Sequence, residues 1–301
     1  MYDLIIIGGG PAAFSAGLYA SRFGINNLII GKILGGTALN AHVIENYPGV
    51  LSTEGSELIE TFQKQAENFG SEVKEEIVKD VKKETNFSIK TENDVYKAKT
   101  VIIATGRKRR KLKVDGEERL SGKGVSYCAT CDAPLYTDQV VGVVGGSDSA
   151  AKEAVLLSKY ASKVYIIYRG NEIHPEKIYK EKVYENEKIE VINNANVKEI
   201  NGENLVESIT LDREFEGDNI LKLDGVFVSI GAIPITTMLE NLDIDKNERG
   251  EIKTDKLAKT NLEGLYAAGD VTDLPYRQIV TAASEGVKAT HSVYEYLKKS
   301  N

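Results

Sequence analysis

The sequence predicts an α/β protein made of two similar units, one of which is inserted into the other. Two segments share a pattern: a short apolar run, a glycine-rich turn, and a helix that carries small and apolar residues. The apolar runs cover residues 3–7 and 139–144, and each helix leads into a further apolar run at residues 27–30 or 163–168. A strand, a helix and a second strand in this order imply parallel strands, because the helix carries the chain back across the sheet.

The turns between strand and helix favour dinucleotide binding. In a G-x-G-x-x-G turn the first glycine permits the tight turn, the second lets a pyrophosphate approach the backbone, and the third small residue lets the helix pack on the strand. The helix N-terminus then faces the phosphates. The two turns read Gly8-Gly9-Gly10-Pro11-Ala12-Ala13 and Gly145-Gly146-Ser147-Asp148-Ser149-Ala150. Ser147 stands where the second glycine belongs, so the second turn is the weaker candidate, and a glycine turn without any ligand is the alternative reading of both.

The position of the second copy predicts a discontinuous first domain. The polar stretch 241–250 resembles a linker, and beyond it residues 264–270 repeat the strand-then-glycine form of residues 100–106. We therefore expect two Rossmann-like dinucleotide-binding domains with three-layer ββα architecture. Residues 1–114 and 245–301 would form the parent domain, and residues 115–244 the inserted one.

Composition and charge exclude several classes of protein. The chain has 301 residues, 42% of them hydrophobic and 28% charged, with 27 Gly and 6 Pro, which argues against collagen-like, low-complexity and disordered chains. The net charge of −7 would repel a phosphate backbone, so we expect no nucleic-acid partner. The first apolar run ends after four residues at Gly8, too short for a signal peptide or membrane anchor. These features predict a cytoplasmic protein without a membrane partner.

The chain has only two cysteines, Cys128 and Cys131, separated by two residues. A zinc site needs four ligands, and the three histidines, at positions 42, 174 and 291, offer no close second pair. A structural disulfide that closes so short a loop would constrain the unfolded chain little, and the cytosol would tend to reduce it. Redox chemistry remains, and it requires a thiolate, a second thiol to resolve the mixed disulfide, and a nearby acid.

At this point several motifs together resemble the low-molecular-weight thioredoxin reductases over nearly the whole chain. The Cys-x-x-Cys-Asp motif just before the second glycine turn is the most specific of them. In order, the motifs are Gly8-x-Gly10-x-x-Ala13, Glu45-Asn46-Tyr47-Pro48-Gly49, Ala104-Thr105-Gly106, Cys128-Ala129-Thr130-Cys131-Asp132, Gly145-Gly146-Ser147-Asp148-Ser149-Ala150 and Tyr266-Ala267-Ala268-Gly269-Asp270.

The resemblance implies FAD in the discontinuous domain and an NAD(P)H-binding-like inserted domain that carries the cysteines. The positions that match FAD contacts are Gly8, Gly10, Pro11, Ala12, Gly35, Gly36, Thr37, Asn46, Ala104, Thr105, Gly106, Gly269, Asp270, Arg277, Gln278 and Ile279. The positions that match nucleotide contacts are Gly145, Gly146, Ser147, Asp148, Ser149 and Arg169. One departure concerns the acid expected near the end of the second strand for a ribose hydroxyl, because Ile30-Gly31-Lys32 contains none.

The same resemblance implies roles for the redox residues. Cys131 would face the flavin and accept its electrons, and Cys128 would be the outer thiol that attacks the disulfide of the partner. Asp132 would be the general acid that protonates the departing thiolate. A helix or turn cap is the alternative role for Asp132.

The electron donor is the point at which the match fails. Relatives that prefer NADPH follow the second strand of the inserted domain with His-Arg-Arg and a further Arg four residues on. Here only Arg169 remains, with Gly170 and His174 at the other two arginine positions and Glu172 nearby. The loss of two charge-assisted contacts, each about 1.5–3 kcal/mol, predicts weak NADPH selectivity. NADPH, NADH and reduced ferredoxin are therefore all candidate donors.

Partners follow from the same comparison. We expect a thioredoxin or thioredoxin-like protein as substrate, and a homodimer by family resemblance. The basic run at residues 107–111 is either a solvated turn or a docking patch for an acidic redox protein. The alternatives to an NADPH-dependent reductase are a thioredoxin-type reductase driven by NADH or reduced ferredoxin, and a dinucleotide-sensing redox regulatory protein.

Overall fold

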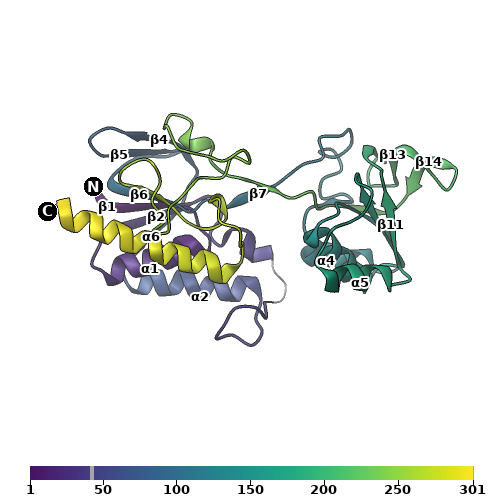
Figure 1. Cartoon of the computed structure of the whole chain (residues 1–301), viewed down its shortest axis with the longest axis horizontal. Helices are drawn as coiled ribbons and strands as arrows, with labels where there is room; N and C mark the ends of the chain where they lie inside the picture. The colour runs from purple at the N-terminus through teal and green to yellow at the C-terminus, as the bar shows by residue number, and fades with distance from the viewer. Residues whose placement is uncertain (41–43, 301) are drawn as a thin grey trace. The chain divides into compact units, whose positions relative to one another are not determined.

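The computed structural model describes residues 1–40 and 44–300, which form two compact α/β units (Figure 1). Unit 1 consists of Met1–Lys108 and Ile233–Asn301, and unit 2 consists of Arg109–Ala232. The expected α/β fold class with two Rossmann-like units, one interrupting the other, is thus confirmed. Within the described part of the chain, no helix is both long and apolar enough to cross a membrane.

The boundaries of the units lie earlier than the sequence-based boundaries at residues 114/115 and 244/245. The two segments that join the units pair with each other as short strands, β7 (Arg107–Arg109) and β16 (Ala232–Pro234). Leu112 and Val114 already pack against the core of unit 2, and Ile244 is buried in the core of unit 1. Because these apolar side chains are already buried in one unit or the other, the connection between the units lies at β7 and β16.

Unit 1 is built on a mixed sheet of order β3-β2-β1-β6-β5-β4, with β17 also paired to β6. Strands β1, β2, β3, β6 and β17 run parallel, whereas β4, β5 and β6 form an antiparallel meander. The strands are β1 (Tyr2–Ile7), β2 (Asn27–Gly31), β3 (Glu72–Glu75), β4 (Val78–Lys83), β5 (Phe87–Thr91), β6 (Val95–Ile103) and β17 (Leu265–Ala267).

The helices of unit 1 cover one face of this sheet, and the meander lies toward the other (Figure 1). They are α1 (Pro11–Arg22), α2 (Gly55–Asn68) and α6 (Ile279–Ser300), with short 3₁₀ turns η1 (Gly36–Asn40), η3 (Thr237–Leu239) and η4 (Gly269–Val271). Leu4 and Ile6 point into the core beneath the helices, whereas Ile5 and Ile7 point into the core beneath the meander. The apolar run at the N-terminus is continuous because both faces of its strand are buried.

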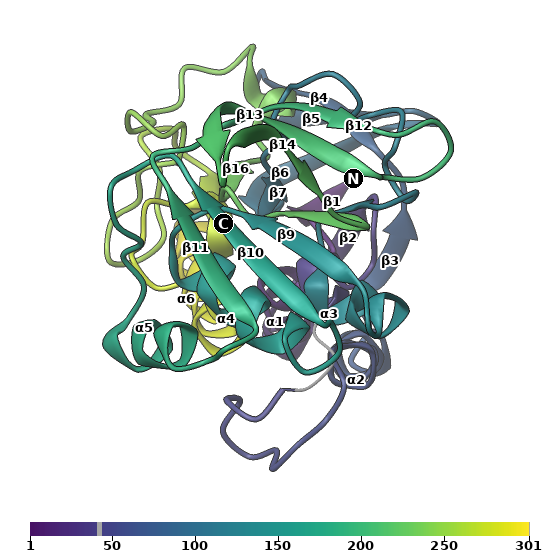
Figure 2. The same cartoon turned by 90° about the vertical axis from the view of Figure 1, so that its right-hand side faces the viewer.

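Unit 2 repeats this design. A parallel sheet of order β11-β10-β9-β15-β8 carries α4 and α5, and an antiparallel sheet of order β12-β13-β14 packs with its own core (Figure 2). The strands are β8 (Val125–Ser126), β9 (Val140–Val144), β10 (Lys163–Tyr168), β11 (Ile189–Asn193), β12 (Val197–Asn201), β13 (Ser208–Phe215), β14 (Asp218–Lys222) and β15 (Gly225–Val228). The helices are α3 (Ala129–Asp132), α4 (Asp148–Leu157) and α5 (Lys177–Tyr184), with the 3₁₀ turn η2 (Ala133–Tyr136).

Candidate active site

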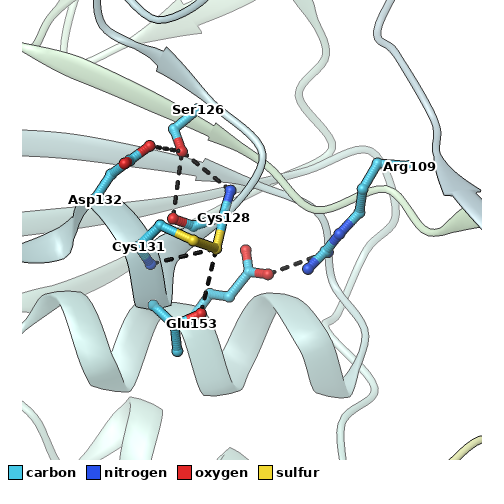
Figure 3. The surroundings of a disulfide bond; sticks show 7 residues. Arg109, Ser126, Cys128, Cys131, Asp132 and Glu153 are labelled. Atoms are coloured by element: carbon cyan, nitrogen blue, oxygen red, sulfur yellow. Dashed lines mark hydrogen bonds and ion pairs between the residues drawn. A yellow bond between two sulfur atoms is a disulfide. The ribbon is translucent and has the colours of Figure 1, made fainter. Parts of the chain in front are cut away.

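The two cysteines form a disulfide at the start of α3 in unit 2 (Figure 3). Cys128 is the N-cap residue of this short helix, and its Sγ accepts the backbone N–H of Cys131 at 3.3 Å. The Cys128 Sγ also lies 3.3 Å from the hydroxyl of Thr130. Cys131 is exposed and Cys128 is half-buried. Hydrogen-bond donors around the Cys128 sulfur would stabilise a thiolate there once the disulfide is reduced.

Ser126, at the end of β8, connects the disulfide to Asp132. Its hydroxyl lies 2.5 Å from Oδ2 of Asp132 and donates to that carboxylate, and it accepts the backbone N–H of Cys128 at 3.0 Å (Figure 3). Ser126 is buried, and Asp132, next to the exposed residue Cys131 in the sequence, is half-buried. The expected redox residues therefore lie together, and sequence reasoning missed the serine that holds the carboxylate. A Ser two residues before the first Cys carries no spacing signal of its own.

The segment before the disulfide is fixed by a buried carboxylate. Glu117 accepts the backbone N–H groups of Leu112 and Lys113 at 2.8 and 2.6 Å, and the hydroxyl of Tyr127 donates to it at 2.7 Å. Burial, together with the hydrogen bond to Glu117, raises the pKa of Tyr127 well above its usual range. Tyr127 thus stays a neutral donor, and the chain leading into Cys128 is tied to unit 2.

A second carboxylate near the disulfide belongs to Glu153 of α4. It pairs with Arg109 at 3.2 Å, and its side chain is largely buried (Figure 3). Burial raises the pKa of Glu153, and the neighbouring Arg109 opposes that shift.

The basic run at residues 107–111 is largely neutralised by the chain itself. Arg107 pairs with Glu251 at 3.1 Å, Arg109 with Glu153, and Lys111 with Glu118 at 2.8 Å. Lys108 and Arg110 are exposed. The run therefore presents far less free positive charge than its sequence indicates, which favours the solvated-turn reading.

In unit 1, the first glycine turn leaves room for a dinucleotide. A Cβ on Gly8 would lie 2.1 Å from the carbonyl oxygen of Ala104, so only glycine permits this approach, whereas a Cβ on Gly10 would meet nothing within 4 Å. Helix α1 begins at Pro11 without a side-chain cap, so its first N–H groups point toward this open space. These features fit the pyrophosphate of FAD.

Of the other residues expected at FAD, Gly35, Gly36 and Gly269 lie against this turn or the start of α1. Gly35 donates its N–H to the Gly9 carbonyl, and a Cβ on Gly36 would lie 3.5 Å from Gly10. A Cβ on Gly269 would lie 3.0 Å from that of Ala12, and the Asn46 amide donates to Gln278 at 3.0 Å. Two of the remaining expected residues are placed by their elements: Thr37 lies in η1, and Ile279 is the first residue of α6. The hydroxyl of Thr105 donates to the Ile235 carbonyl, and Gly106 has a positive φ.

A charged cluster that sequence reasoning missed lies beside Asp270. Glu251 is buried and accepts from Arg277 at 2.6 Å as well as from Arg107. Glu285 is buried on α6 and accepts the N–H of Gly269 at 2.7 Å. Burial raises the pKa of both Asp270 and Glu285, and the two guanidiniums oppose that shift at Asp270. A sequence signal existed only for Glu285, which interrupts the apolar face that Ala282, Ala289 and Val293 form on α6.

The second turn has the same backbone, with different side chains. A Cβ on Gly145 would lie 2.2 Å from the Ser229 carbonyl oxygen, as Gly8 approaches Ala104 in unit 1. Asp148 begins α4, and its carboxylate accepts the N–H of Glu176 at 2.5 Å. Ser149 and Arg169 are exposed. The ring of Tyr168 packs on Gly146, as the backbone of Ile33 and Leu34 packs on the equivalent Gly9, and Ser147 takes the place that Gly10 has in the first turn.

Among residues 1–40 and 44–300, no group of three His, Cys, Asp or Glu side chains is arranged to hold a metal ion. His42, one of the histidines considered as a zinc ligand, lies outside the described residues.

We expect Ser126→Ala to slow thiol–disulfide exchange by the reduced cysteine pair about tenfold, because Asp132 loses the hydroxyl that holds it. The fall should appear in kcat for a disulfide substrate, with KM and flavin content unchanged. Ser126→Thr keeps a hydroxyl and should restore most of the rate. If the Ala and Thr variants lose activity equally, or if only KM changes, Ser126 does not position the carboxylate.

Asp270→Asn should weaken FAD binding by roughly 10- to 100-fold, the cost of a lost charge-assisted hydrogen bond, without lowering the stability of the apoprotein. Because the folded-state pKa of Asp270 lies above the unfolded value near 3.8, ionisation favours the unfolded chain as the pH rises through that window. The stability of the Asn apoprotein relative to wild type should therefore increase from mild acid toward neutral pH. FAD titration and thermal unfolding measure both effects, with Asp273→Asn as control. An Asn apoprotein that is less stable at neutral pH would contradict this account.

Comparison with known proteins agrees with this geometry. The family model of the pyridine nucleotide-disulphide oxidoreductases matches residues 2–286. A thioredoxin reductase from Bacillus subtilis (strain 168) is 41% identical over 303 residues, covering 99% of this chain and 96% of that protein.

Solved structures give the same result. The Lactococcus lactis thioredoxin reductase has a TM-score of 0.91 and 33% identity, covering 99% of this chain and 100% of that one. A ferredoxin-flavin thioredoxin reductase from Clostridium acetobutylicum has a TM-score of 0.55 and 32% identity, covering 99% and 98%. The family implies FAD and a pyridine nucleotide, of which the first glycine turn fits FAD. The chain therefore belongs to the pyridine nucleotide-disulphide oxidoreductase family, as a flavoprotein disulfide reductase of the thioredoxin reductase type.

Proposed function

We propose that this chain reduces the disulfide of a thioredoxin or thioredoxin-like protein, and that Cys128, Cys131 and Asp132 carry out the exchange. The observation that carries the proposal is the Cys128–Cys131 disulfide beside the Ser126–Asp132 pair, within a chain that matches thioredoxin reductases over 99% of its length. FAD, when bound in unit 1, would supply the electron pair that reduces this disulfide.

The exchange itself follows thiol–disulfide chemistry. After reduction, the Cys128 thiolate attacks one sulfur of the partner's disulfide, so that a mixed disulfide forms and the partner's other sulfur leaves as a thiolate. Asp132 donates the proton that this leaving thiolate takes up. The Asp132 carboxylate then takes the proton of the Cys131 thiol, and the Cys131 sulfur attacks the Cys128 sulfur. This restores the intramolecular disulfide, and the partner's second sulfur leaves as a thiolate that takes up a proton from water, so that the partner is released as a dithiol. The donors that surround the Cys128 sulfur favour its thiolate, which supports Cys128 as the attacking residue.

The partner's potential sets a limit on this step. Thioredoxin has a reduction potential of about −270 mV, and about 30 mV corresponds to 1.4 kcal/mol for two electrons. The Cys128–Cys131 pair must therefore have a potential close to or below this value for transfer to be favourable.

For the site residues, we propose the assignment that the fit of the first turn supports. Gly8, Gly10, Pro11 and Ala12 would contact the pyrophosphate of FAD, and Asp270 a ribityl hydroxyl. The remaining candidate contacts are Gly35, Gly36, Thr37, Asn46, Ala104, Thr105, Gly106, Gly269, Arg277, Gln278 and Ile279. The open space at Gly10 and the uncapped start of α1 support this proposal.

We propose that NADPH is not the preferred donor. Of the three positions at which NADPH-preferring relatives carry arginine, Arg169 alone does so in this sequence, and Glu172 nearby pairs with Lys180 at 2.5 Å. NADH and reduced ferredoxin are the other candidates, and the ferredoxin-flavin thioredoxin reductase among the similar structures supports the second.

A homodimer is part of the proposal, and unit 1 offers a surface for it. A groove between α1, α2 and α6 is lined by apolar and aromatic side chains, including Phe14, Tyr19, Tyr47 and Phe62. Tyr19 is partly exposed at this groove. A cytoplasmic location, where thiols are kept reduced, would suit the exposed dithiol.

The cysteine roles can be tested on the FAD-loaded protein reduced chemically with dithionite. Oxidised thioredoxin should reoxidise the flavin of wild type as fast as the enzyme turns over. In Cys128→Ser and Cys131→Ser the flavin should stay reduced. Cys131→Ser with reduced protein should additionally trap a mixed disulfide with thioredoxin through Cys128, visible by mass spectrometry. A trapped adduct formed by Cys128→Ser but not by Cys131→Ser would reverse the assignment.

The donor can be tested by anaerobic reduction of the flavin with NADPH, NADH and reduced ferredoxin in parallel. With two arginine contacts missing, we expect NADPH to show no advantage over NADH in the observed rate. Strong preference for NADPH in stopped-flow traces would contradict weak selectivity. If Lys108 and Arg110, the exposed cations of the basic run outside its three ion pairs, attract ferredoxin, the rate of flavin reduction by ferredoxin should fall as the salt concentration rises.

A further inference from the structure

The two glycine turns of this chain have nearly identical backbones, so their side chains can be compared position by position. Gly10 has φ −95° and ψ −171°, and Ser147 has φ −96° and ψ −178°, each as the N-cap residue of the following helix. Gly8 and Gly145 have φ +139° and +148°. Ser147 therefore occupies in unit 2 the place that Gly10 occupies in unit 1.

This equivalence shows where the Ser147 side chain lies. A Cβ on Gly10 would enter space that is empty within 4 Å, which is the space through which a pyrophosphate approaches the backbone. The same backbone conformation at Ser147 directs its Cβ and hydroxyl into the corresponding space of unit 2. A phosphate there would have to displace this side chain.

The ends of strands β2 and β10 also differ in the size of the side chain that borders the turn. Ile7 pairs with Ile30 in unit 1, and Val144 pairs with Ile167 in unit 2, so Gly31 and Tyr168 are the equivalent next residues. The carboxyl ends of these strands border the crevice in which a dinucleotide's ribose binds. Unit 1 has no side chain at Gly31, and the backbone of Ile33 lies on Gly9, whereas unit 2 has an aromatic ring on the equivalent Gly146.

The Tyr168 ring is held over the second turn. A Cβ on Gly146 would lie 2.4 Å from the ring, and one on Gly170 would lie 2.6 Å from it, so the ring rests directly on both glycines. Its hydroxyl lies 3.2 Å from Nδ1 of His174, and the His174 backbone N–H donates to the Gly146 carbonyl at 2.8 Å. The ring, the histidine and the turn thus support one another.

We propose that Ser147 and Tyr168 close the second turn to the pyrophosphate and adenosine ribose of NADPH and NADH alike. Unit 2 then keeps a dinucleotide-binding fold as the carrier of the disulfide without binding a pyridine dinucleotide. This inference rests on the proposed function, and it narrows the donor to a reductant that needs no nucleotide site. Two molecules of a reduced iron–sulfur protein of the ferredoxin class, each giving one electron, supply the pair that FAD requires.

The test measures nucleotide binding to the FAD-loaded protein in its oxidised, resting form. NADP⁺ and NAD⁺ are titrated by calorimetry into wild type, into Ser147→Gly/Tyr168→Ala, and into Tyr184→Ala as control. Tyr184 is a 54% exposed tyrosine at the end of α5, so its truncation removes a ring of the same kind away from the turn. Thermal unfolding and flavin content accompany each titration.

We expect wild type and the control to show no saturable binding. The double variant should bind at least one nucleotide at least about tenfold more tightly than the limit that the titration sets for wild type. Anaerobic NADH and NADPH should likewise bleach the flavin of the double variant faster than that of wild type. If Tyr168→Ala lowers the unfolding temperature, Ser147→Gly/Tyr168→Val removes the ring, places a β-branched residue at the end of β10 and serves as the second variant. Saturable binding of either nucleotide by wild type overturns the proposal, and so does an opened, folded variant that still binds neither.

A separate measurement keeps this result apart from the proposed function. Wild type reduced by dithionite is mixed with oxidised thioredoxin, a reaction that needs no nucleotide site. If the flavin stays reduced, the proposed disulfide reductase activity fails whatever the titrations show. If it is reoxidised while wild type binds nucleotide tightly, only the closure of the second turn fails.

Discussion

Both units depend on one close approach between backbones. Where β1 ends, Gly8 passes the carbonyl of Ala104 so closely that a Cβ on Gly8 would lie 2.1 Å from the oxygen. Where β9 ends, a Cβ on Gly145 would lie 2.2 Å from the carbonyl oxygen of Ser229. This contact draws the turn against the end of the neighbouring parallel strand, and so fixes where α1 and α4 begin and which way their N-termini point. Any larger residue would push the turn off the sheet. The positions of the candidate FAD contacts and of the helix beneath the disulfide follow from it.

The parts of the fold governed by this constraint were predictable from the sequence. The strands at residues 3–7, 27–30, 139–144 and 163–168 could be identified because a strand buried on both faces is a continuous apolar run in the sequence. The glycine turn after the first strand of each pair marked the start of the helix between them. The insertion followed from finding the pattern twice. The boundaries did not, because polar composition at residues 241–250 marks an exposed surface loop of unit 1, with Ile244 buried beside it, and the actual connection is a pair of short strands.

The candidate site divides in the same way. Cys128, Cys131 and Asp132 are adjacent in sequence, so their proximity needed no tertiary information. Ser126, Glu251 and Glu285 were missed because each acts through a contact set by packing: a hydroxyl turned toward a carboxylate, a buried acid between two arginines, and an acid on an otherwise apolar helix face. The basic run was misleading for the same reason, since its charge is offset by carboxylates that are distant in sequence. Side-chain pairing across a fold leaves no periodic trace.

The two turns also differ in what they require from a ligand. The starts of α1 and α4 both lack a side-chain cap, but in unit 1 the space above Gly10 is open and burial raises the pKa of Asp270. A bound phosphate and a hydroxyl donor would satisfy these groups, so ligand binding adds directly to the stability of the native state. In unit 2 the Tyr168 ring already covers the turn and bonds His174, and Asp148 accepts a backbone N–H from the segment before α5. The open space and the buried carboxylate of unit 1 thus make its full stability depend on the cofactor, whereas side-chain contacts within the protein already stabilise the second turn.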